Sequence, residues 1–285
     1  MSRGSSNLHR ILDRAAAALR DAGALLIGAG AGMGVDSGLP DFRGVHGFWK
    51  AYPPYAGLGL DFVSLANPRW FRTDPELAWG FYGHRLELYR RTRPHAGYAI
   101  LAQWFGRMPQ GGFVYTSNVD GHFQRAGFPG DLVYEVHGAI DFLQCTADCG
   151  VGIFPADGWT LRIDESSMRA LPPLPACPRC QSLARPNVLM FGDGQWDPTR
   201  SDAQRQRLRS WLRSLAGARL VVLECGAGTA VPTVRIACED LTRQLAGTLI
   251  RINPREPDVP PGQISLPMPA LEALQALQER LATAE

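Results

Sequence analysis

The sequence lacks the features that would assign it to several specialised classes. No apolar run approaches the ~20 residues needed to cross a bilayer, and residues 1–23 predict an amphipathic helix rather than a secretory signal. The net charge is only +2, which favours neither nucleic acid nor a membrane as a specific partner. Internal repeats are absent. We therefore expect a cytoplasmic protein of one large domain or two modest ones.

Cysteine is also scarce, and its spacing is informative. Six cysteines in a reducing compartment argue against a disulfide framework. Four of them form a C-x3-C pair and a C-x2-C pair: Cys145, Cys149, Cys177 and Cys180. Two such pairs can supply the tetrahedral thiolate site that structural zinc requires, and the alternative is a set of buried free cysteines. Cys225 and Cys238 have no such spacing and are expected in the core.

Short apolar runs alternate with helical patterns along most of the chain. The runs expected to form strands are residues 24–27, 112–116, 132–136, 185–191, 219–223 and 248–252. The patterns expected to form helices are residues 95–107, 201–216, 234–246 and 270–284. This alternation predicts an α/β fold with a Rossmann-like, mostly parallel sheet and helices on both faces.

Two stretches interrupt the alternation. Residues 48–93 have no strand signal and are rich in aromatic residues, so we expect a helical insertion. Residues 142–184 hold the four paired cysteines and predict a zinc-binding insertion. The expected division is a Rossmann-like domain formed by residues 1–47, 94–141 and 185–285, and a small domain formed by residues 48–93 and 142–184.

A glycine-rich segment follows the first expected strand. Glycines at such a position let the backbone approach a diphosphate. The usual G-x-G-x-x-G spacing and the Walker lysine are both absent, which counts against a nucleoside triphosphatase. The glycines alone are equally consistent with a tight turn. The continuation Pro40, Asp41, Phe42 and Arg43 favours a ligand site, because such residues are not needed in a turn.

Residues 30–43 (GAGMGVDSGLPDFR) closely resemble the sirtuin signature GAGISxxSGIPDFR. Further segments resemble sirtuin motifs in the same order. They are TSNVD at residues 116–120, HG at 137–138, the four cysteines, RPNVLMFGD at 185–193, GAGT at 226–229 and IN at 252–253. The resemblance covers nearly the whole chain and implies an enzyme that consumes NAD to remove acyl groups from protein lysines.

The resemblance also implies roles for individual residues. His137 would deprotonate a ribose hydroxyl, which then attacks the alkylimidate formed between NAD and the acyl-lysine. An imidazole with a pKa of ~6.5 is a usable base at neutral pH, although a lone histidine is more often a loop residue. Asn118 and Asp120 would hold the nicotinamide amide and a water. The expected cofactor-binding residues are Gly30, Ala31, Gly32, Asp41, Phe42, Arg43, Ser117, Asn118, Asp120, Gly226, Ala227, Gly228 and Asn253.

A tyrosine and an arginine within the helical insertion predict an acyl preference. Tyr82 and Arg85 lie three residues apart and share one face of a helix. They resemble a pair with which some sirtuins accept acidic acyl groups, which implies succinyl- or malonyl-lysine substrates beside acetyl-lysine. The alternative is a helix with its tyrosine packed inward and its arginine outward. The segment at residues 185–193 would pair with the substrate peptide as an added strand, or form an ordinary core strand.

Three positions near the cofactor depart from the sirtuin pattern. Gly34 stands where the family has serine, Ser117 replaces the glutamine of TQN, and residues 226–232 fit the family's GTSLxVxP poorly. An NAD glycohydrolase or an ADP-ribosyltransferase on the same scaffold is therefore the alternative function, and a non-catalytic NAD sensor is a third.

Overall fold

A computed structural model describes residues 3–40, 48–50, 52–215 and 217–283, with side chains described from residue 6 onward. Its centre is a six-stranded sheet with the order β11-β10-β9-β1-β2-β3, in which every neighbouring pair is parallel. These strands are β1 (Ala24–Ala29), β2 (Gly112–Thr116), β3 (Val133–Glu135), β9 (Leu220–Cys225), β10 (Thr248–Ile252) and β11 (Ile264–Leu266). The predicted α/β fold is confirmed.

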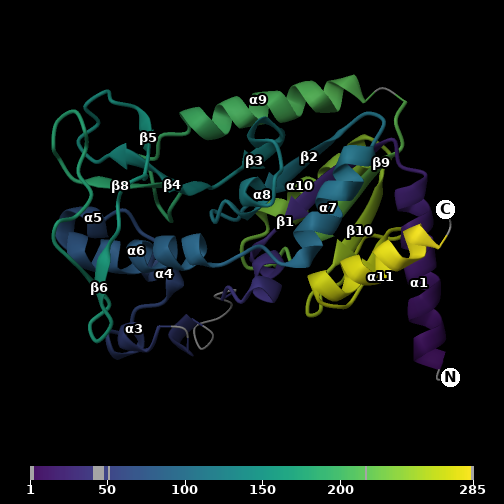
Figure 1. Cartoon of the computed structure of the whole chain (residues 1–285), viewed down its shortest axis with the longest axis horizontal. Helices are drawn as coiled ribbons and strands as arrows, with labels where there is room; N and C mark the ends of the chain where they lie inside the picture. Colours follow the sequence, from purple (N-terminus) through teal and green to yellow (C-terminus); the bar gives the residue numbers. More distant parts are fainter. Residues whose placement is uncertain (1–2, 41–47, 51, 216, 284–285) are drawn as a thin grey trace.

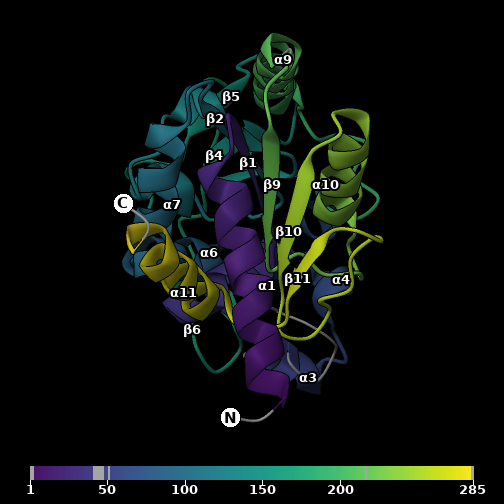
Figure 2. The ribbon, with the colours of Figure 1, turned by 90° about the vertical axis from the view of Figure 1, so that its right-hand side faces the viewer.

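Both faces of this sheet are buried, as a parallel sheet requires. Along β1, Leu25 and Ile27 belong to one core cluster and Ala24 and Leu26 to another, because successive side chains point to opposite faces. The first face is covered by α1 (Arg3–Arg20), α7 (Ala96–Arg107), α8 (His122–Arg125) and α11 (Ala270–Ala282). The second is covered by α9 (Thr199–Ser214) and α10 (Thr233–Gln244). Figure 2 shows α7 and α11 on one side of the strands and α10 on the other.

A second set of elements lies at the opposite end of the molecule from the chain termini (Figure 1). Its helices are α3 (Pro53–Gly57), α4 (Phe62–Leu65), α5 (Trp70–Thr73) and α6 (Pro75–Arg91). Its strands are β4 (Gly138–Cys145), β5 (Ile153–Pro155) and β8 (Ala184–Val188), which form an antiparallel sheet, and the pair β6 (Arg162–Asp164) and β7 (Arg169–Leu171). These elements share their own core cluster. The division of the chain into two domains stays a prediction.

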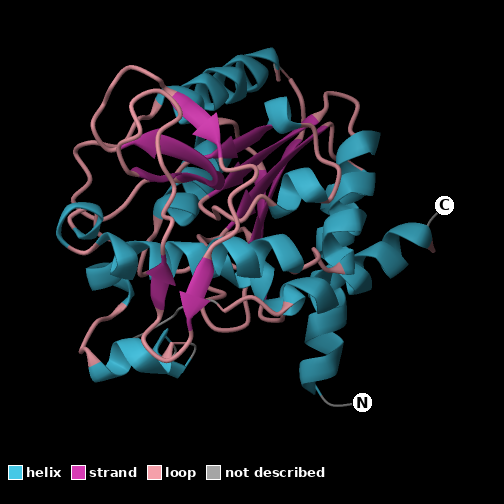
Figure 3. Cartoon of the chain, turned by 60° about the vertical axis from the view of Figure 1, so that its left-hand side comes forward, coloured by secondary structure: helices cyan, strands magenta, loops and turns pink. Residues whose placement is uncertain are grey.

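The hairpin of β6 and β7 packs directly on α6, and glycine makes this approach possible. A Cβ added at Gly80 would lie 1.9 Å from the Met168 carbonyl oxygen. Arg169 on β7 forms a bidentate pair with Asp74 at the start of α6, with both N–O distances at 2.7 Å. The helical insertion and the cysteine-bearing insertion are therefore packed together. In Figure 3, helices surround the larger group of strands on several sides.

The glycine-rich segment after β1 forms a short 3-10 helix, η1 (Ala31–Ser37), and a second such turn, η2 (Gly130–Leu132), precedes β3. Two distant helices hold η1. The Leu271 amide at the start of α11 donates to the Asp36 carboxylate at 2.8 Å, and the His95 amide before α7 donates to the Ser37 hydroxyl at 3.0 Å. In the described part of the chain, no helix is long and apolar enough to cross a membrane.

Candidate active site

The carboxyl ends of five parallel strands bring the predicted site residues to one edge of the sheet. Ala29 at the end of β1 is in register with Thr116 of β2 and Cys225 of β9. Thr116 pairs in turn with Glu135 of β3, and Cys225 pairs with Ile252 of β10. The segments that follow these strands therefore begin at the same level. The chain adds β2 and β3 on one side of β1, and then β9, β10 and β11 on its other side. Ligands bind at such a switch point in sheets of this kind.

Two glycine-rich segments meet there, backbone against backbone. The Gly32 amide donates to the Gly226 carbonyl at 3.0 Å. A Cβ on Gly30 would lie 2.7 Å from the Ala227 Cα atom, and one on Gly32 would lie 2.8 Å from the Gly226 Cα atom. Gly226 has a φ of +63°, and a Cβ there would lie 2.3 Å from the Met33 nitrogen. Glycine is required at these positions by packing between the loops, in addition to any ligand contact.

Asn118 and Asp120 follow β2. The Asn118 Nδ2 atom donates to the Gly30 carbonyl at 3.0 Å, which links this segment to the glycine-rich loop. The Asp120 carboxylate is buried and accepts a hydrogen bond from the His122 amide at 2.9 Å. Burial raises the pKa of Asp120, while this hydrogen bond and the charge of Arg125 oppose the rise.

His137 lies just after β3 and just before β4. Its carbonyl accepts a hydrogen bond from the Leu189 amide at 2.9 Å. The next residue, Gly138, has a φ of +77°, and a Cβ there would lie 2.1 Å from the Asn187 carbonyl oxygen. Burial lowers the pKa of the His137 imidazole, and a hydrogen bond with the Ser117 backbone opposes that shift. The imidazole is therefore mainly neutral at pH 7, which is the form a general base needs.

These residues line a single cavity of about 670 Å³. Ten of the residues predicted for the site lie in its wall: Gly30, Ala31, Tyr82, Arg85, Ser117, Asn118, Asp120, His137, Ala227 and Gly228. Gly32, Gly226 and Asn253 do not line it. Asp41, Phe42 and Arg43 lie outside the described residues. A volume of this size is typical of sites for cofactors and small ligands.

Asn253 has a supporting position behind the cavity wall. It is fully buried, and its Nδ2 atom donates to the Ala227 carbonyl at 2.8 Å. Its Oδ1 atom accepts from the amides of Arg255 and Glu256, each at 3.0 Å. The side chain therefore holds the loop after β9 against the loop after β10, and its predicted contact with a ribose stays a prediction.

The far end of the cavity is aromatic and contains one buried cation. Arg85 on α6 is 7% exposed, and its Nε and Nη2 atoms donate to the Tyr89 hydroxyl at 3.0 and 2.7 Å. The guanidinium carbon lies 5.2 to 5.8 Å from the ring centroids of Phe81, Tyr89, Phe62 and Tyr82. Tyr82 and Arg85 thus both reach the cavity, so the alternative of an outward-pointing arginine does not hold, and their contact with an acyl group stays a prediction.

Sequence reasoning missed several residues of the cavity wall. Tyr89 lies one helical turn after Arg85, so the i, i+4 spacing could have revealed it. Phe62 and Glu256 carry no sequence signal of their own, because tertiary packing brings them to the cavity.

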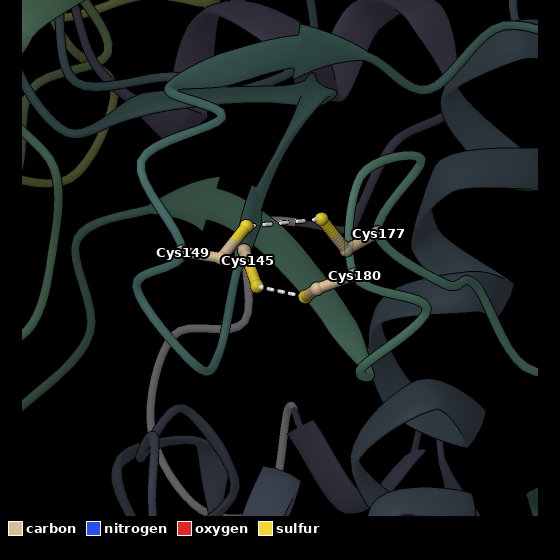
Figure 4. A group of neighbouring side chains, drawn as sticks. All are labelled: Cys145, Cys149, Cys177 and Cys180. Atoms are coloured by element: carbon tan, nitrogen blue, oxygen red, sulfur yellow. Dashed lines mark hydrogen bonds between the residues drawn. The ribbon is translucent and has the colours of Figure 1, made fainter.

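The four paired cysteines converge at the end of β4 and the loop before β8, as Figure 4 shows. The Sγ atoms of Cys145 and Cys180 are 3.5 Å apart, as are those of Cys149 and Cys177, and all four Sγ atoms lie within 4.8 Å of one another. A tetrahedral zinc with Zn–S bonds of about 2.3 Å needs sulfur atoms roughly 3.8 Å apart. The cluster therefore fits structural zinc, with no ligand position left open for catalysis.

The C-x3-C pair has one more residue between its cysteines than the C-x2-C pair, and a tight turn accommodates it. Asp148, directly before Cys149, adopts a left-handed conformation with a φ of +45°. This turn brings Cys149 back toward Cys177 despite the longer spacing.

Comparison with known proteins agrees with this geometry. The Sir2 family model matches residues 30–210. A protein of Archaeoglobus fulgidus named NAD-dependent protein deacylase 1 is 31% identical over 232 residues, covering 81% of this chain and 82% of the relative. The NAD-dependent protein deacylase of Deinococcus radiodurans is 32% identical over 273 residues, covering 94% of this chain and 98% of the relative. The Danio rerio protein named NAD-dependent protein deacylase sirtuin-5, mitochondrial, is 33% identical over 208 residues, covering 68% and 63%.

Solved structures are similar over nearly the full length. A crystal structure of a Sir2 homologue with NAD is 28% identical, with a TM-score of 0.68 and coverage of 95% of this chain and 94% of the other. A mutant Sir2 homologue in complex with ADP-ribose is 28% identical, with a TM-score of 0.69 and coverage of 95% and 96%. The motif order, the fold, the cavity and these matches agree: the chain belongs to the Sir2 family.

Proposed function

We propose that this chain is an NAD-dependent protein-lysine deacylase that yields nicotinamide, O-acyl-ADP-ribose and free lysine. The observation that carries the proposal is the convergence of His137, Asn118, Asp120 and the glycine-rich loops on one cavity. A protein that only binds NAD needs no buried base at this position.

NAD supplies the glycosidic bond that is broken and the ADP-ribose that accepts the acyl group. The backbone around Gly30 and Ala227 presents a close-packed surface to the dinucleotide. The Asn118 Nδ2 atom donates a hydrogen bond to the Gly30 carbonyl. Asn118 therefore offers its Oδ1 atom to the nicotinamide amide. His137, neutral at pH 7, accepts the proton of a ribose hydroxyl.

The other end of the cavity supports a preference for acidic acyl groups. Arg85 is buried with Tyr82 in the cavity wall, and a guanidinium can hold a carboxylate in a bidentate pair. We therefore propose succinyl- or malonyl-lysine as substrates beside acetyl-lysine. The substrates are acylated lysines of proteins, and residues 189–191 beside the cavity would pair with the extended peptide.

The test is incubation of the protein with NAD and acylated peptides, with the products identified by mass spectrometry. We expect O-acyl-ADP-ribose and free lysine. His137→Ala should lower the rate about 10²- to 10⁴-fold, the usual contribution of a general base. His9→Ala is a matched control, because His9 is exposed on α1, away from the cavity. Release of free ADP-ribose without any peptide would instead support the glycohydrolase alternative.

A further inference from the structure

Lysine is nearly absent from this sequence, although lysine is the residue on which the proposed reaction acts. Of the 29 basic residues, 28 are arginine, and Lys50 is the only lysine. Lysine is ordinarily among the commonest residues of a soluble domain. Arginine makes the buried ion pairs of Arg185 with Asp193 and of Arg251 with Glu224. These ion pairs therefore contain guanidinium groups and no amine.

Acyl thioesters react differently with these two kinds of cation. A lysine amine that has lost its extra proton attacks the thioester carbonyl carbon. The C–N bond forms, the C–S bond breaks, and a proton passes from the nitrogen to the departing thiolate. A guanidinium has a pKa above about 12 and stays protonated in proteins, so it offers no free electron pair for this attack. Lys50 is therefore the one side-chain amine that an acyl thioester can modify.

The Lys50 side chain is exposed, and cysteine thiols are the competing nucleophiles. Cys225 and Cys238 are fully buried, and burial raises the pKa of both thiols, so neither is a reactive thiolate. The other four cysteines form the cluster that fits structural zinc. Hydroxylamine cleaves a thioester formed at any thiol and leaves the amide of an acylated lysine intact. Acylation at Lys50 can therefore be measured separately from acylation of the cysteines.

The backbone around Lys50 is folded into a helical turn. Residues 48–50 are helical, and the Tyr52 amide donates to the Phe48 carbonyl at 2.9 Å. The neighbouring Trp49 indole donates to the Leu60 carbonyl at 2.8 Å. Lys50 is therefore presented on a turn that is closed by a hydrogen bond, and not on an extended segment.

The aromatic residues on both sides of Lys50 are buried. Phe48 is fully buried and its ring is stacked with the Tyr55 ring, at a centroid distance of 6.2 Å. Tyr52 is 1% exposed, and its hydroxyl is 3.1 Å from the His84 Nδ1 atom. A substrate that pairs as an added strand must be extended on both sides of its lysine. Lys50 can meet this requirement only if the two flanking aromatic side chains leave the core.

We propose that Lys50 is the single side chain at which acyl thioesters stably modify this protein, and that the protein does not remove the acyl group from its own Lys50 while it is folded. The second half of this inference rests on the deacylase function proposed above. The arginine cations, Arg85 among them, keep their charge under conditions that acylate lysines. Acylated Lys50 is then a lasting mark of exposure to acyl donors.

The first test is treatment of the protein with acetyl-CoA in the absence of NAD, then hydroxylamine, digestion and mass spectrometry. Beside any modification of the α-amino group, we expect one acetylated side chain, at Lys50, and none in Lys50→Arg. The treated Lys50→Arg variant should keep its full activity on an acetyl-lysine peptide, because no side-chain amine remains. Serum albumin in the same tube shows that the reagent is active. Unmodified Lys50 beside acetylated albumin, or stable adducts on other side chains, would overturn the first half of the inference.

The second test gives the Lys50→Arg enzyme and NAD two substrates: the folded protein acetylated at Lys50, and a synthetic peptide of residues 44–56 with acetyl-lysine at position 50. We expect the peptide to lose its acetyl group at least about 100-fold faster, because the folded protein must first expose two buried aromatic side chains. Equal rates overturn the second half of the inference. Removal from neither substrate overturns it as well, since the fold is then not what protects Lys50. An unrelated acetyl-lysine peptide shows in that case whether the deacylase function fails too.

Discussion

Main-chain atoms form one end of the main cavity, and long side chains form the other. At the cofactor end, Gly30, Gly226 and Ala227 pack backbone against backbone, with no room for larger side chains. At the acyl end, Arg85 lies among aromatic rings, and the wall is formed by long side chains. The comparison shows that main-chain packing fixes the cofactor end, whereas long side chains form the end where the proposed function places the acyl group.

The largest expected effect is a loss of NAD affinity after substitution at the cofactor end. Gly226→Ala should abolish NAD binding, a loss of at least about 100-fold in affinity, because the new Cβ would meet the Met33 nitrogen and the Gly32 backbone in a left-handed conformation. Isothermal titration with NAD measures the loss, and a thermal melt shows how much folded protein remains.

Gly34→Ala is the matched control in the facing loop. The atom nearest to a Cβ there would be the Leu39 Cδ1 atom at 3.2 Å, at the end of a side chain that can move, and the Leu39 Cβ atom would be at an ordinary contact distance of 3.5 Å. Affinity for NAD should change little. Equal losses in both variants would break the comparison, since they would show that the loops tolerate no substitution at all.

A smaller and more selective effect is expected at the acyl end. Arg85→Met should lower kcat/KM for succinyl-lysine peptides about 10- to 100-fold, the value of charge-assisted hydrogen bonds to a carboxylate, and leave acetyl-lysine peptides nearly unchanged. Arg85→Lys should restore only part of the loss, because lysine lacks the planar fork. Steady-state kinetics on paired peptides measure both, and unchanged desuccinylation in Arg85→Met would refute the assignment.

The last effect concerns stability rather than ligand binding, and it depends on pH in the region behind Asp120. Burial lowers the pKa of His122 from 6.5 to about 4, with the charges of Arg125 and His95 acting in the same direction. Since the unfolded chain takes up this proton first, stability should fall as the pH drops from 6.5 toward 4, by up to about 1.4 kcal/mol per pH unit. His122→Phe should flatten that dependence in urea unfolding measured across this range. An equally steep profile in the variant would assign the effect to other groups.

Much of the fold could be predicted because its strands are short, apolar and followed by turn residues. The strand at residues 112–116 was predicted with its observed bounds. β4 was missed for a physical reason: its pairing with β8 shifts register between Ala139 and Leu143, so Ile140 and Leu143 do not alternate as a regular strand would. The strand predicted at residues 185–191 ends at Val188, because the Phe191 amide turns to the Ala66 carbonyl.

The site residues that follow strands could be predicted from the sequence, whereas the positions of those that depend on tertiary packing could not. His137, Asn118 and Asp120 follow strands of a parallel sheet, so their convergence is a consequence of topology that motifs can reveal. The buried position of Arg85 and the structural use of Asn253 depend on packing between distant segments. Sequence spacing suggested that Arg85 and Tyr82 share a helix face, and only the tertiary structure shows that this face is turned toward the cavity.

The hydrogen bond from the Leu271 amide to Asp36 has a consequence for how the chain resists proteolysis. It joins the last helix to the loop that receives the cofactor, across 235 positions of sequence. A ligand that steadies η1 is therefore expected to steady the start of α11 too, so local opening of the C-terminal segment should become less frequent while NAD is bound. We therefore expect limited proteolysis that begins at α11 to slow when NAD is added.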